Sequence, residues 1–242
     1  MIDAQAPVFA FDTLDSTNSE ARRRADAGDF GPAWLVARTQ SAGRGRRGRS
    51  WVNTPGAFLG TYLGHTPLPP AQLARLSLAA GVAVVEALAA CDRPGARLKW
   101  PNDVFLDGGK VGGILLESSA AGSGGLWFAL GIGVNLAALP EGVGQAVASA
   151  GGVAPDAFQK ALCERLSAGG AALAGGQFET VRAGWLSHAV GLGQTVTATL
   201  GADTLRGEFL DLDADGALLM QTPQGIVRIT AGDVFFPDMM DE

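Results

Sequence analysis

Apolar positions along the chain recur either at helical spacing or in short runs. Apolar residues repeat every three or four positions between Pro70 and Cys91, which predicts an amphipathic helix there. The same spacing predicts two further helices, at 158–166 and 178–185, divided by a stretch rich in Gly and Ala. The segment from Pro70 to Cys91 is the clearest helix in the sequence.

A shorter helix is predicted near the N-terminus. The stretch STNSEARRRADAG opens with Thr17, has Glu20 three residues later and closes on Gly28. A hydroxyl residue followed three positions later by Glu is the pattern of a capping box at a helix start. Strands are predicted where short apolar runs occur, at 8–11, 34–37 and 58–63.

Predicted strands and turns outnumber predicted helices in the second half of the chain. Residues 96–119 predict two strands joined by a turn at Asp107-Gly108-Gly109, because these residues tolerate the positive φ of tight hairpins, and LWFALGIGVNL predicts another strand. After Gln194 come four short β-like runs without a helix, with turns at Gly201, Asp215-Gly216 and Gly225. We therefore expect a larger domain of helices and strands at 1–188, which the resemblance given below implies to be the catalytic domain, and a small all-β domain at 189–242.

Composition limits the kinds of protein this can be. The chain has 242 residues, 47% of them hydrophobic, which is enough for a sizeable core. Asp3 precedes the first apolar run and no basic residue does, unlike a secretory signal, and no apolar stretch is expected to span a membrane. A reduced cytoplasm is therefore expected, with Cys91 and Cys163 as buried thiols rather than a metal or redox pair.

The stretch QSAGRGRRGRSW, residues 40–51, concentrates four arginines between Arg44 and Arg49 in a chain of net charge -6. It could be a solvated basic loop, a nucleic-acid clamp or a phosphate-binding loop of a small-molecule site. Nucleic-acid binders usually carry a broad basic face, whereas here the basic charge is one island in an acidic protein. A compact anionic ligand is favoured, and any metal is expected to be magnesium held by carboxylate and phosphate.

Two familiar nucleotide motifs fail in context. Gly43, Gly45 and Gly48 match G-x-G-x-x-G, but Pro55 and Gly56 follow where a helix should begin. The stretch GGKV does not fit a P-loop, because no glycine stands five positions before Gly109 and Val111 stands where a P-loop needs Ser or Thr.

Five other stretches occur in a fixed order: DSTN at 15–18, QSAGRGRRGRSW at 40–51, KWPNDV at 99–104, KVGGILLE at 110–117 and GIGVNL at 131–136. In order and wording they resemble the biotin protein ligase family. The resemblance implies an α+β fold related to class II aminoacyl-tRNA synthetases, a mixed sheet with helices on one side, followed by a small SH3-like β-barrel. It fits the form that lacks an N-terminal DNA-binding helix-turn-helix, so no specific nucleic-acid partner is expected.

The reaction implied by the resemblance has two steps. Biotin is activated with MgATP to biotinyl-5′-AMP, and biotin is then transferred to one lysine of a biotin carboxyl carrier domain of a carboxylase. The implied ligands are biotin, ATP and Mg²⁺, and the enzyme would be a monomer or a homodimer with no membrane partner. Two alternatives remain, a lipoate or octanoyl ligase or transferase of the same superfamily, and an RG-rich nucleic-acid-binding protein.

The resemblance also assigns residues to roles. The expected biotin-binding residues are Ser16, Thr17, Asn18, Gln40, Gly43, Arg44, Gly45, Arg46, Lys110, Gly112 and Gly113. The expected ATP and adenylate contacts are Arg46, Arg49, Trp51, Asn102, Lys110 and Asn135. The expected catalytic residues are Lys110, Arg46 and Asp103, with Asp103 also the metal ligand.

Each of these residues also has a purely structural interpretation. Thr17 could simply cap a helix, Trp51 could be a core residue, and Lys110 could be a solvated residue at a hairpin exit. Lysine is rare in this chain, with three residues against fifteen arginines, and two of the three lie inside the matched stretches. The arginine stretch at 43–51 is expected to be mobile without ligand and to order over biotin and the adenylate.

Overall fold

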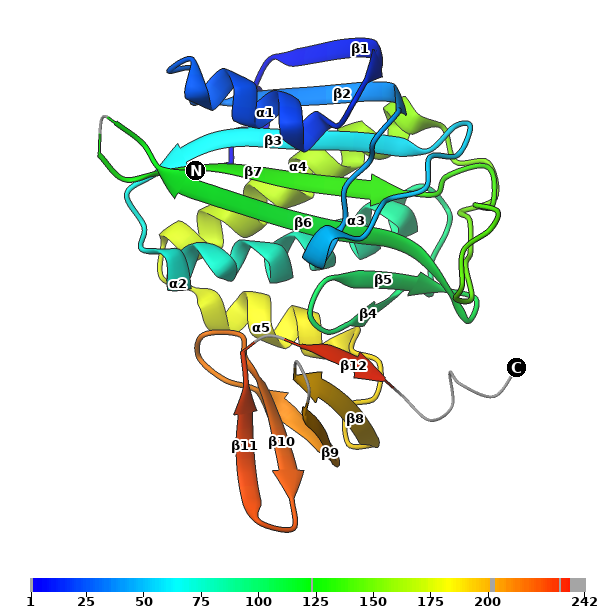
Figure 1. Ribbon diagram of the computed structural model, residues 1–242, viewed down its shortest axis with the longest axis vertical. Helices are drawn as coiled ribbons and strands as arrows, with labels where there is room; N and C mark the ends of the chain where they lie inside the picture. Colours follow the sequence, from blue (N-terminus) through cyan, green and yellow to red (C-terminus); the bar gives the residue numbers. More distant parts are fainter. Residues whose placement is uncertain (1, 123, 201–202, 231, 236–242) are drawn as a thin grey trace.

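A mixed seven-stranded sheet forms the centre of the protein (Figure 1). The computed structural model describes residues 2–122, 124–200, 203–230 and 232–235. The strands are β1 Val8–Leu14, β2 Ala33–Gln40, β3 Phe58–Thr66, β4 Arg97–Lys99, β5 Asp103–Leu106, β6 Gly109–Ala120 and β7 Leu126–Val134. Their order is β1-β2-β3-β7-β6-β5-β4, with β1 and β2 parallel and the other neighbours antiparallel.

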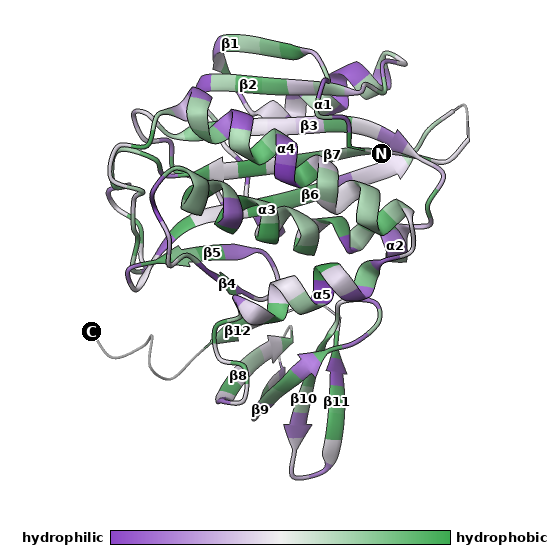
Figure 2. Ribbon diagram, turned by 180° about the vertical axis from the view of Figure 1, so that it is seen from behind, coloured by the Kyte–Doolittle hydropathy of each residue, from purple (hydrophilic) through white to green (hydrophobic). Residues whose placement is uncertain are grey.

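Helices cover the two faces of this sheet unequally. The helices are α1 Thr17–Asp26, α2 Pro70–Ala74, α3 Leu76–Ala90, α4 Pro155–Ala174 and α5 Phe178–Ser187. The long helices α3 and α4 lie on one face and the short α1 on the other (Figures 1 and 2). Successive side chains of β2 point to opposite faces of the sheet, so Trp34 packs into the larger core under α3 and α4 while Leu35 packs beneath α1. The rest of the α1 face is left for a pocket.

Two predicted helices differ in their bounds from the observed ones. The segment from Pro70 to Cys91 is divided at Arg75 into α2 and α3. The stretch rich in Gly and Ala does divide the later helices, at 175–177, but its first part, with Gly169 and Gly170, belongs to α4, which runs to Ala174. A Cβ on Gly170 would lie 3.0 Å from Ile2, so the small residues are there for close packing rather than for a break.

The predicted capping box is wrong. Ser16, not Thr17, is the N-cap residue, and it makes no side-chain cap hydrogen bond. Thr17 is the first helical residue and its hydroxyl donates to Gln40 Oε1. Glu20 instead forms ion pairs with Arg23 and Arg24 on the helix surface. The polar residues at this helix start therefore serve tertiary contacts.

The C-terminal part forms a five-stranded antiparallel sheet of order β11-β10-β9-β8-β12. Its strands are β8 Thr195–Leu200, β9 Asp203–Leu212, β10 Leu218–Thr222, β11 Gly225–Ile229 and β12 Asp233–Phe235. The turn between β9 and β10 touches the main sheet, where Trp100 Nε1 donates to Gly216 O at 3.1 Å. The turn predicted at Gly201 lies outside the described residues.

The described segment Pro70–Ala90 is apolar and long enough to cross a membrane by length and composition, contrary to the expectation from sequence. Most of it is buried, however, and α3 packs between the sheet and α4 as a core helix. Both cysteines are free and partly buried, and burial raises the pKa of the Cys163 thiol to about 11. The prediction of buried thiols is therefore met only in part.

Candidate functional site

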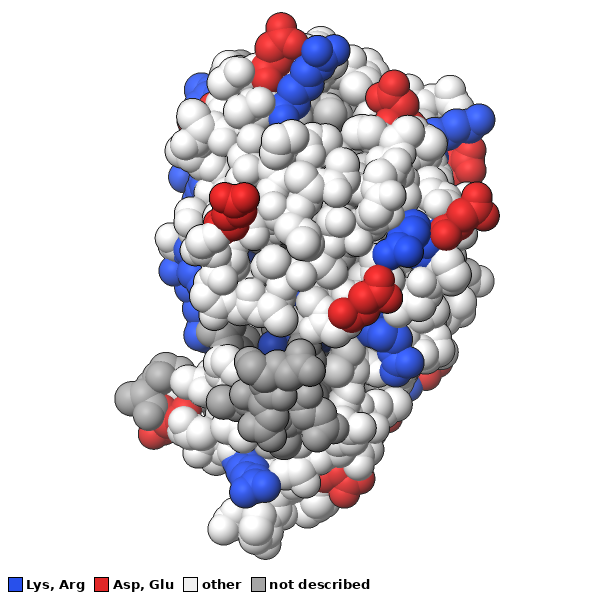
Figure 3. Space-filling model, turned by 90° about the vertical axis from the view of Figure 1, so that its right-hand side faces the viewer, with Lys and Arg blue, Asp and Glu red and all other residues white. Residues whose placement is uncertain are grey.

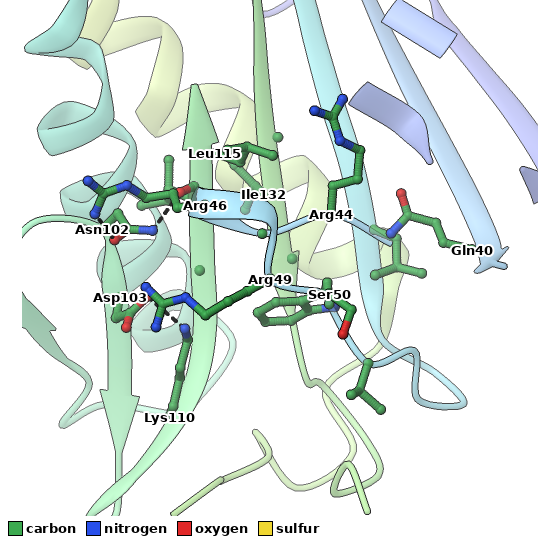
Figure 4. A pocket seen from close by; sticks show the side chains of 18 of the residues that line it. Gln40, Arg44, Arg46, Arg49, Ser50, Asn102, Asp103, Lys110, Leu115 and Ile132 are labelled. Carbon is green, nitrogen blue, oxygen red and sulfur yellow. Dashed lines mark hydrogen bonds and ion pairs between the residues drawn. The ribbon is translucent and has the colours of Figure 1, made fainter. Parts of the chain in front are cut away.

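A pocket that is open to solvent lies on the α1 face of the main sheet (Figure 4). Glycines on β7 let two side chains lie close to the sheet, because a Cβ on Gly131 would lie 2.2 Å from Asn18 Oδ1 and one on Gly133 would lie 2.8 Å from the Trp51 ring. The floor of the pocket is therefore glycine backbone against which Asn18 and Trp51 pack.

The arginine stretch folds over this floor as a small hairpin. Trp51 N donates to Gly43 O at 2.9 Å, and Gly45 N donates to Arg49 O at 2.7 Å. A short 3-10 turn, η1 Arg46–Gly48, forms the tip, with φ of 54° at Arg47 and 74° at Gly48. No dinucleotide-type helix follows in this described segment, which agrees with the rejection of the G-x-G-x-x-G motif.

One end of the pocket is built at the start of α1. Ser16, Thr17 and Asn18 are all buried there. Gln40 Oε1 accepts hydrogen bonds from the Thr17 backbone N–H at 2.7 Å and from its hydroxyl at 3.1 Å. We call this the neutral end: it is defined by Ser16, Thr17, Asn18, Gln40 and the fully buried Thr61, whose hydroxyl lies 2.7 Å from that of Thr17.

The entry into α1 is fixed by an ion pair. Asp15 accepts two hydrogen bonds from the Arg23 guanidinium, at 2.8 and 2.9 Å, and one from the Ser16 backbone. The hydrogen bond from Arg23 holds the pKa of the Asp15 carboxyl at about 2, well below its usual range. Because Asp15 stays charged at neutral pH, it stabilises the turn that presents Ser16 to the pocket.

The opposite end carries charge, and we call it the charged end, defined by Arg46, Arg49, Asn102, Asp103 and Lys110 (Figure 4). Lys110 Nζ lies 2.7 Å from Asp103 Oδ1, and both side chains are only about one-fifth exposed, at 18% and 23%. Arg46 donates to Asn102 Oδ1 at 2.9 Å. Cationic and acidic groups thus meet at one spot beside the floor.

The β5–β6 hairpin explains how Lys110 reaches this position. Its turn has positive φ at Asp107 and Gly108, as predicted. On its outer side Lys110 N donates to Ala146 O at 3.0 Å, and Ala148 N donates to Lys110 O at 2.9 Å. Lys110 is therefore paired with β5 on one side and with residues 146–148 on the other. Because its side chain is only 18% exposed, it is not a solvated turn lysine.

Trp51 and Asn135 lie near the floor between the two ends. The Trp51 ring rests over the glycines of β6 and β7, and Lys110 Nζ lies 5.9 Å from its centroid. Asn135 is 2% exposed and donates to Ala148 O at 3.1 Å, but its Oδ1 has no hydrogen-bond partner among the residues that the structure describes. A buried acceptor without a partner is costly, so a ligand donor at this position would be favourable.

Most of the predicted site residues meet in this one pocket. Fourteen of them line it: Ser16, Thr17, Asn18, Gln40, Arg44, Gly45, Arg46, Arg49, Trp51, Asn102, Asp103, Lys110, Gly113 and Asn135. Gly43 and Gly112 lie behind the lining, where a Cβ on Gly43 would lie 2.6 Å from Trp51 O.

The sequence analysis missed Thr61 of the neutral end and Glu117, both of which hydrogen-bond to Asn18 without lining the pocket themselves. Thr61 is the one polar residue in the predicted strand run 58–63 apart from Tyr62, and that interruption was an available signal. Glu117 ends the stretch KVGGILLE but was given no role. Within the described residues, no group of three or more His, Cys, Asp or Glu side chains could hold a metal ion by itself.

The face of the molecule that lies on the right in Figure 1 shows no broad basic surface. Figure 3 shows that Lys, Arg, Asp and Glu side chains are scattered there among uncharged residues. Positive charge gathers instead along the left edge of that view, toward the front of Figure 1, where the pocket opens. This distribution suits a compact anion better than a nucleic-acid duplex.

Comparisons with known proteins identify the family of the chain. The Biotin/lipoate A/B protein ligase family matches residues 15–135, and the Biotin protein ligase C terminal domain matches residues 191–236. The biotin–[acetyl-CoA-carboxylase] ligase of Paracoccus denitrificans is 42% identical over 92% of this chain and 97% of its own. That of Mycobacterium tuberculosis is 33% identical over 90% of this chain and 85% of its own.

A solved structure also aligns along nearly the whole chain. The biotin protein ligase from Aquifex aeolicus in complex with biotin and ATP has a TM-score of 0.79 and 27% identity, covering 94% of this chain and 97% of that one. The matched stretches, the two family matches and the relatives that align along most of their length all agree. The chain therefore belongs to the Biotin/lipoate A/B protein ligase family, and within it to the biotin protein ligases.

Proposed function

We propose that this pocket activates biotin with MgATP to biotinyl-5′-AMP and then transfers the biotinyl group to a lysine of a biotin carboxyl carrier domain. The observation that carries the proposal is the division of one pocket into a neutral, hydrogen-bonding end and a charged end. Biotin has the same division, with an uncharged ureido ring and a carboxylate at the end of its chain.

The neutral end would hold the ureido ring. A dry site needs donors and acceptors at fixed positions to recognise an uncharged polar group. Ser16, Thr17 and Gln40 supply hydroxyls and an amide that are buried or half-buried, and Thr17 and Gln40 are hydrogen-bonded to each other. The backbone at Gly45 and Gly113 would border the biotin chain, with Gly43 and Gly112 behind it and with Asn18 and Arg44 completing this end.

The charged end would carry out the first step. A carboxylate oxygen of biotin attacks the α-phosphorus of ATP, a new P–O bond forms, and the bond to pyrophosphate breaks. Negative charge is concentrated in a small volume during this step. Lys110 and Arg46 would neutralise it, because charged groups already held in place need no reorganisation during the reaction. The pair between Lys110 and Asp103 orients the ammonium beforehand.

The second step consumes the mixed anhydride. The ε-amine of the acceptor lysine attacks the biotinyl carbonyl carbon, the C–O bond to phosphate breaks, and AMP leaves while the amine loses a proton. The arginine hairpin at 43–51 would cover the intermediate until the acceptor arrives, which excludes water from a hydrolysable bond.

The nucleotide would lie along Trp51 and Asn135. The Trp51 ring offers a flat surface on which adenine can stack. The unpartnered Asn135 Oδ1 can accept a hydrogen bond from an exocyclic amine such as that of adenine. Arg49 and Asn102 line the same region and would contact the phosphates.

Asp103 fits a magnesium ion held mainly by the nucleotide. Magnesium in such sites is usually bound by one or two carboxylates together with substrate phosphates. Asp103 uses Oδ1 for Lys110, so its carboxylate can still offer Oδ2 to a metal. The ion would supply charge neutralisation on the phosphates.

Incubating the chain with labelled biotin, ATP and a carrier domain tests the proposal. Label should appear on the carrier only when ATP is present, and biotin should drive exchange between pyrophosphate and ATP. Replacing biotin with lipoate or octanoate tests the related ligases, and binding to a labelled oligonucleotide tests a nucleic-acid function. Transfer of lipoate but not of biotin would overturn the proposal.

A further inference from the structure

Glu117 on β6 joins two parts of the site that come from distant segments of the chain. Its carboxylate accepts hydrogen bonds from Arg44 at 2.9 and 3.3 Å, so the pair is bidentate. The same carboxylate accepts a hydrogen bond from Asn18 Nδ2 at 2.9 Å. One side chain thus connects the arginine hairpin with the first turn of α1.

The Asn18 amide is almost completely used by the protein. Its two N–H donors reach Glu117 and the Leu115 carbonyl, the latter at 3.4 Å, and its oxygen accepts from Thr61 at 2.6 Å. An Asn side chain has two donors and two acceptor positions, so no donor is left for a ligand. Asn18 lies against the bare backbone of Gly131, where it helps to shape the neutral end.

Arg44 differs from the other arginines of the hairpin in direction. Figure 4 shows Arg44 extending away from the group formed by Arg46, Arg49 and Lys110, on the side where Gln40 lies. Glu117 is 22% exposed and Arg44 42% exposed, so their pair is only partly screened by water. With its guanidinium held by a carboxylate, Arg44 is suited to anchor the hairpin rather than to neutralise phosphate.

We propose that Glu117 is a positioning residue for biotin: it ties Arg44 of the hairpin to Asn18 of α1 and thereby keeps the hairpin closed over the neutral end of the pocket. The inference rests on the proposed function and adds to it a residue with no assigned role. It separates the hairpin into an anchoring arginine, Arg44, and phosphate-facing arginines, Arg46 and Arg49.

The Glu117→Gln variant tests this with little change in shape. Gln can still accept from Asn18, but it loses the charge that holds Arg44. We expect the KM for biotin in pyrophosphate exchange to rise about tenfold, as for one lost hydrogen bond to a charged group. We expect kcat at saturating biotin to stay within about twofold, because the charged end is untouched.

The free protein provides a second readout. Trypsin should cut within residues 44–49 several times faster in Glu117→Gln than in wild type, because the hairpin has lost its anchor. Glu86→Gln, at an exposed position on α3, is the matched control and should change neither the KM nor the cleavage rate. A thermal melt of each variant confirms that it is folded.

A double variant tests whether Glu117 acts through Arg44. If it does, Arg44→Gln with Glu117→Gln should have the same KM for biotin as Arg44→Gln alone. Full additivity of the two effects would overturn the inference. So would a fall in kcat with unchanged KM, or an unchanged KM together with an unchanged cleavage rate.

Failure of this inference can be told apart from failure of the proposed function. If wild type shows no biotin-dependent pyrophosphate exchange, the proposed function is wrong. The cleavage rates of the free proteins then still show whether Glu117 holds the hairpin through Arg44. If wild type is active and Glu117→Gln equals wild type in KM and cleavage, only the role of Glu117 is wrong.

Discussion

The two ends of the pocket are held together in different ways. At the neutral end, Thr17, Asn18, Gln40 and Thr61 come from three elements, and their polar groups bind one another; Gln40 is half-buried and the other three are buried. At the charged end, Lys110 and Asp103 come from a single hairpin, and their side chains are about one-fifth exposed. The neutral end is therefore held by a network of mostly buried side chains, whereas the charged end holds an ion pair that is partly exposed in the pocket.

This difference predicts that the two ends affect different quantities, the binding of biotin and the rate of adenylate formation. Groups that already bind one another in the free protein form a fixed shape, so changing one alters how well a ligand fits. Groups that face charge developing in the reaction lower the barrier instead. Changes at the neutral end should therefore act mainly on the KM for biotin, and changes at the charged end mainly on the rate of adenylate formation.

The largest effect is expected for Lys110→Ala. Losing one preorganised electrostatic contact typically slows a reaction by about 10²- to 10³-fold, and a partly exposed lysine contributes little to folding. Biotin-dependent pyrophosphate exchange measures this step apart from transfer, with Lys160→Ala, at an exposed position on α4, as the control. A rate within about threefold of wild type, a barrier change below roughly 0.7 kcal/mol, would make Lys110 a structural residue only.

A smaller effect is expected for Gly131→Ala at the neutral end. The new Cβ would lie 2.2 Å from Asn18 Oδ1, so the Asn18 side chain must move and the floor changes shape. Overpacking of this kind costs about 1–3 kcal/mol, and we expect the KM for biotin to rise by at least about tenfold.

The control for this change is Gly122→Ala, because a Cβ there meets nothing within 4 Å. Isothermal titration of biotin into both variants measures the effect directly. Wild-type affinity in Gly131→Ala would show that Asn18 does not shape the biotin site.

Thr61→Val should act in the same direction but more weakly. Valine keeps the shape of threonine and removes the hydroxyl that donates to Asn18 Oδ1, so one buried acceptor loses its donor. We expect biotin affinity to fall by about fivefold at unchanged kcat, with Thr13→Val, at an exposed position on β1, as the control. A fall in kcat instead would contradict the division between the two ends.

The smallest effect is expected in the mobility of the arginine hairpin. Biotin with ATP should slow tryptic cleavage after the arginines at 44–49 by a few fold, because the ligands fill the space beneath it. The effect is modest because main-chain hydrogen bonds and Glu117 already hold the hairpin in the free protein. Equal rates with and without ligands would show that the hairpin is not a lid.

The sequence analysis succeeded where the signal was local. The turn at Asp107 and Gly108 follows from residues that accept positive φ, and the structure has positive φ at both. The order of the five matched stretches predicted the α+β fold of biotin protein ligases, and the structural neighbours confirm it. The analysis failed where a polar residue could serve either a local or a distant partner, as with Thr17, which binds Gln40 instead of capping its helix.

Local patterns and the matched stretches were enough to predict the fold class, the family and the kinds of residue in the site. Which of these residues lie in contact depends on the tertiary packing. Asn18, Arg44 and Glu117 are separated by up to 99 positions, and their contacts arise because the sheet brings α1, the hairpin and β6 to one side of the pocket. Hydrogen bonds and ion pairs act over a few ångströms, so a residue's partner depends on the packing of elements that local sequence patterns do not specify.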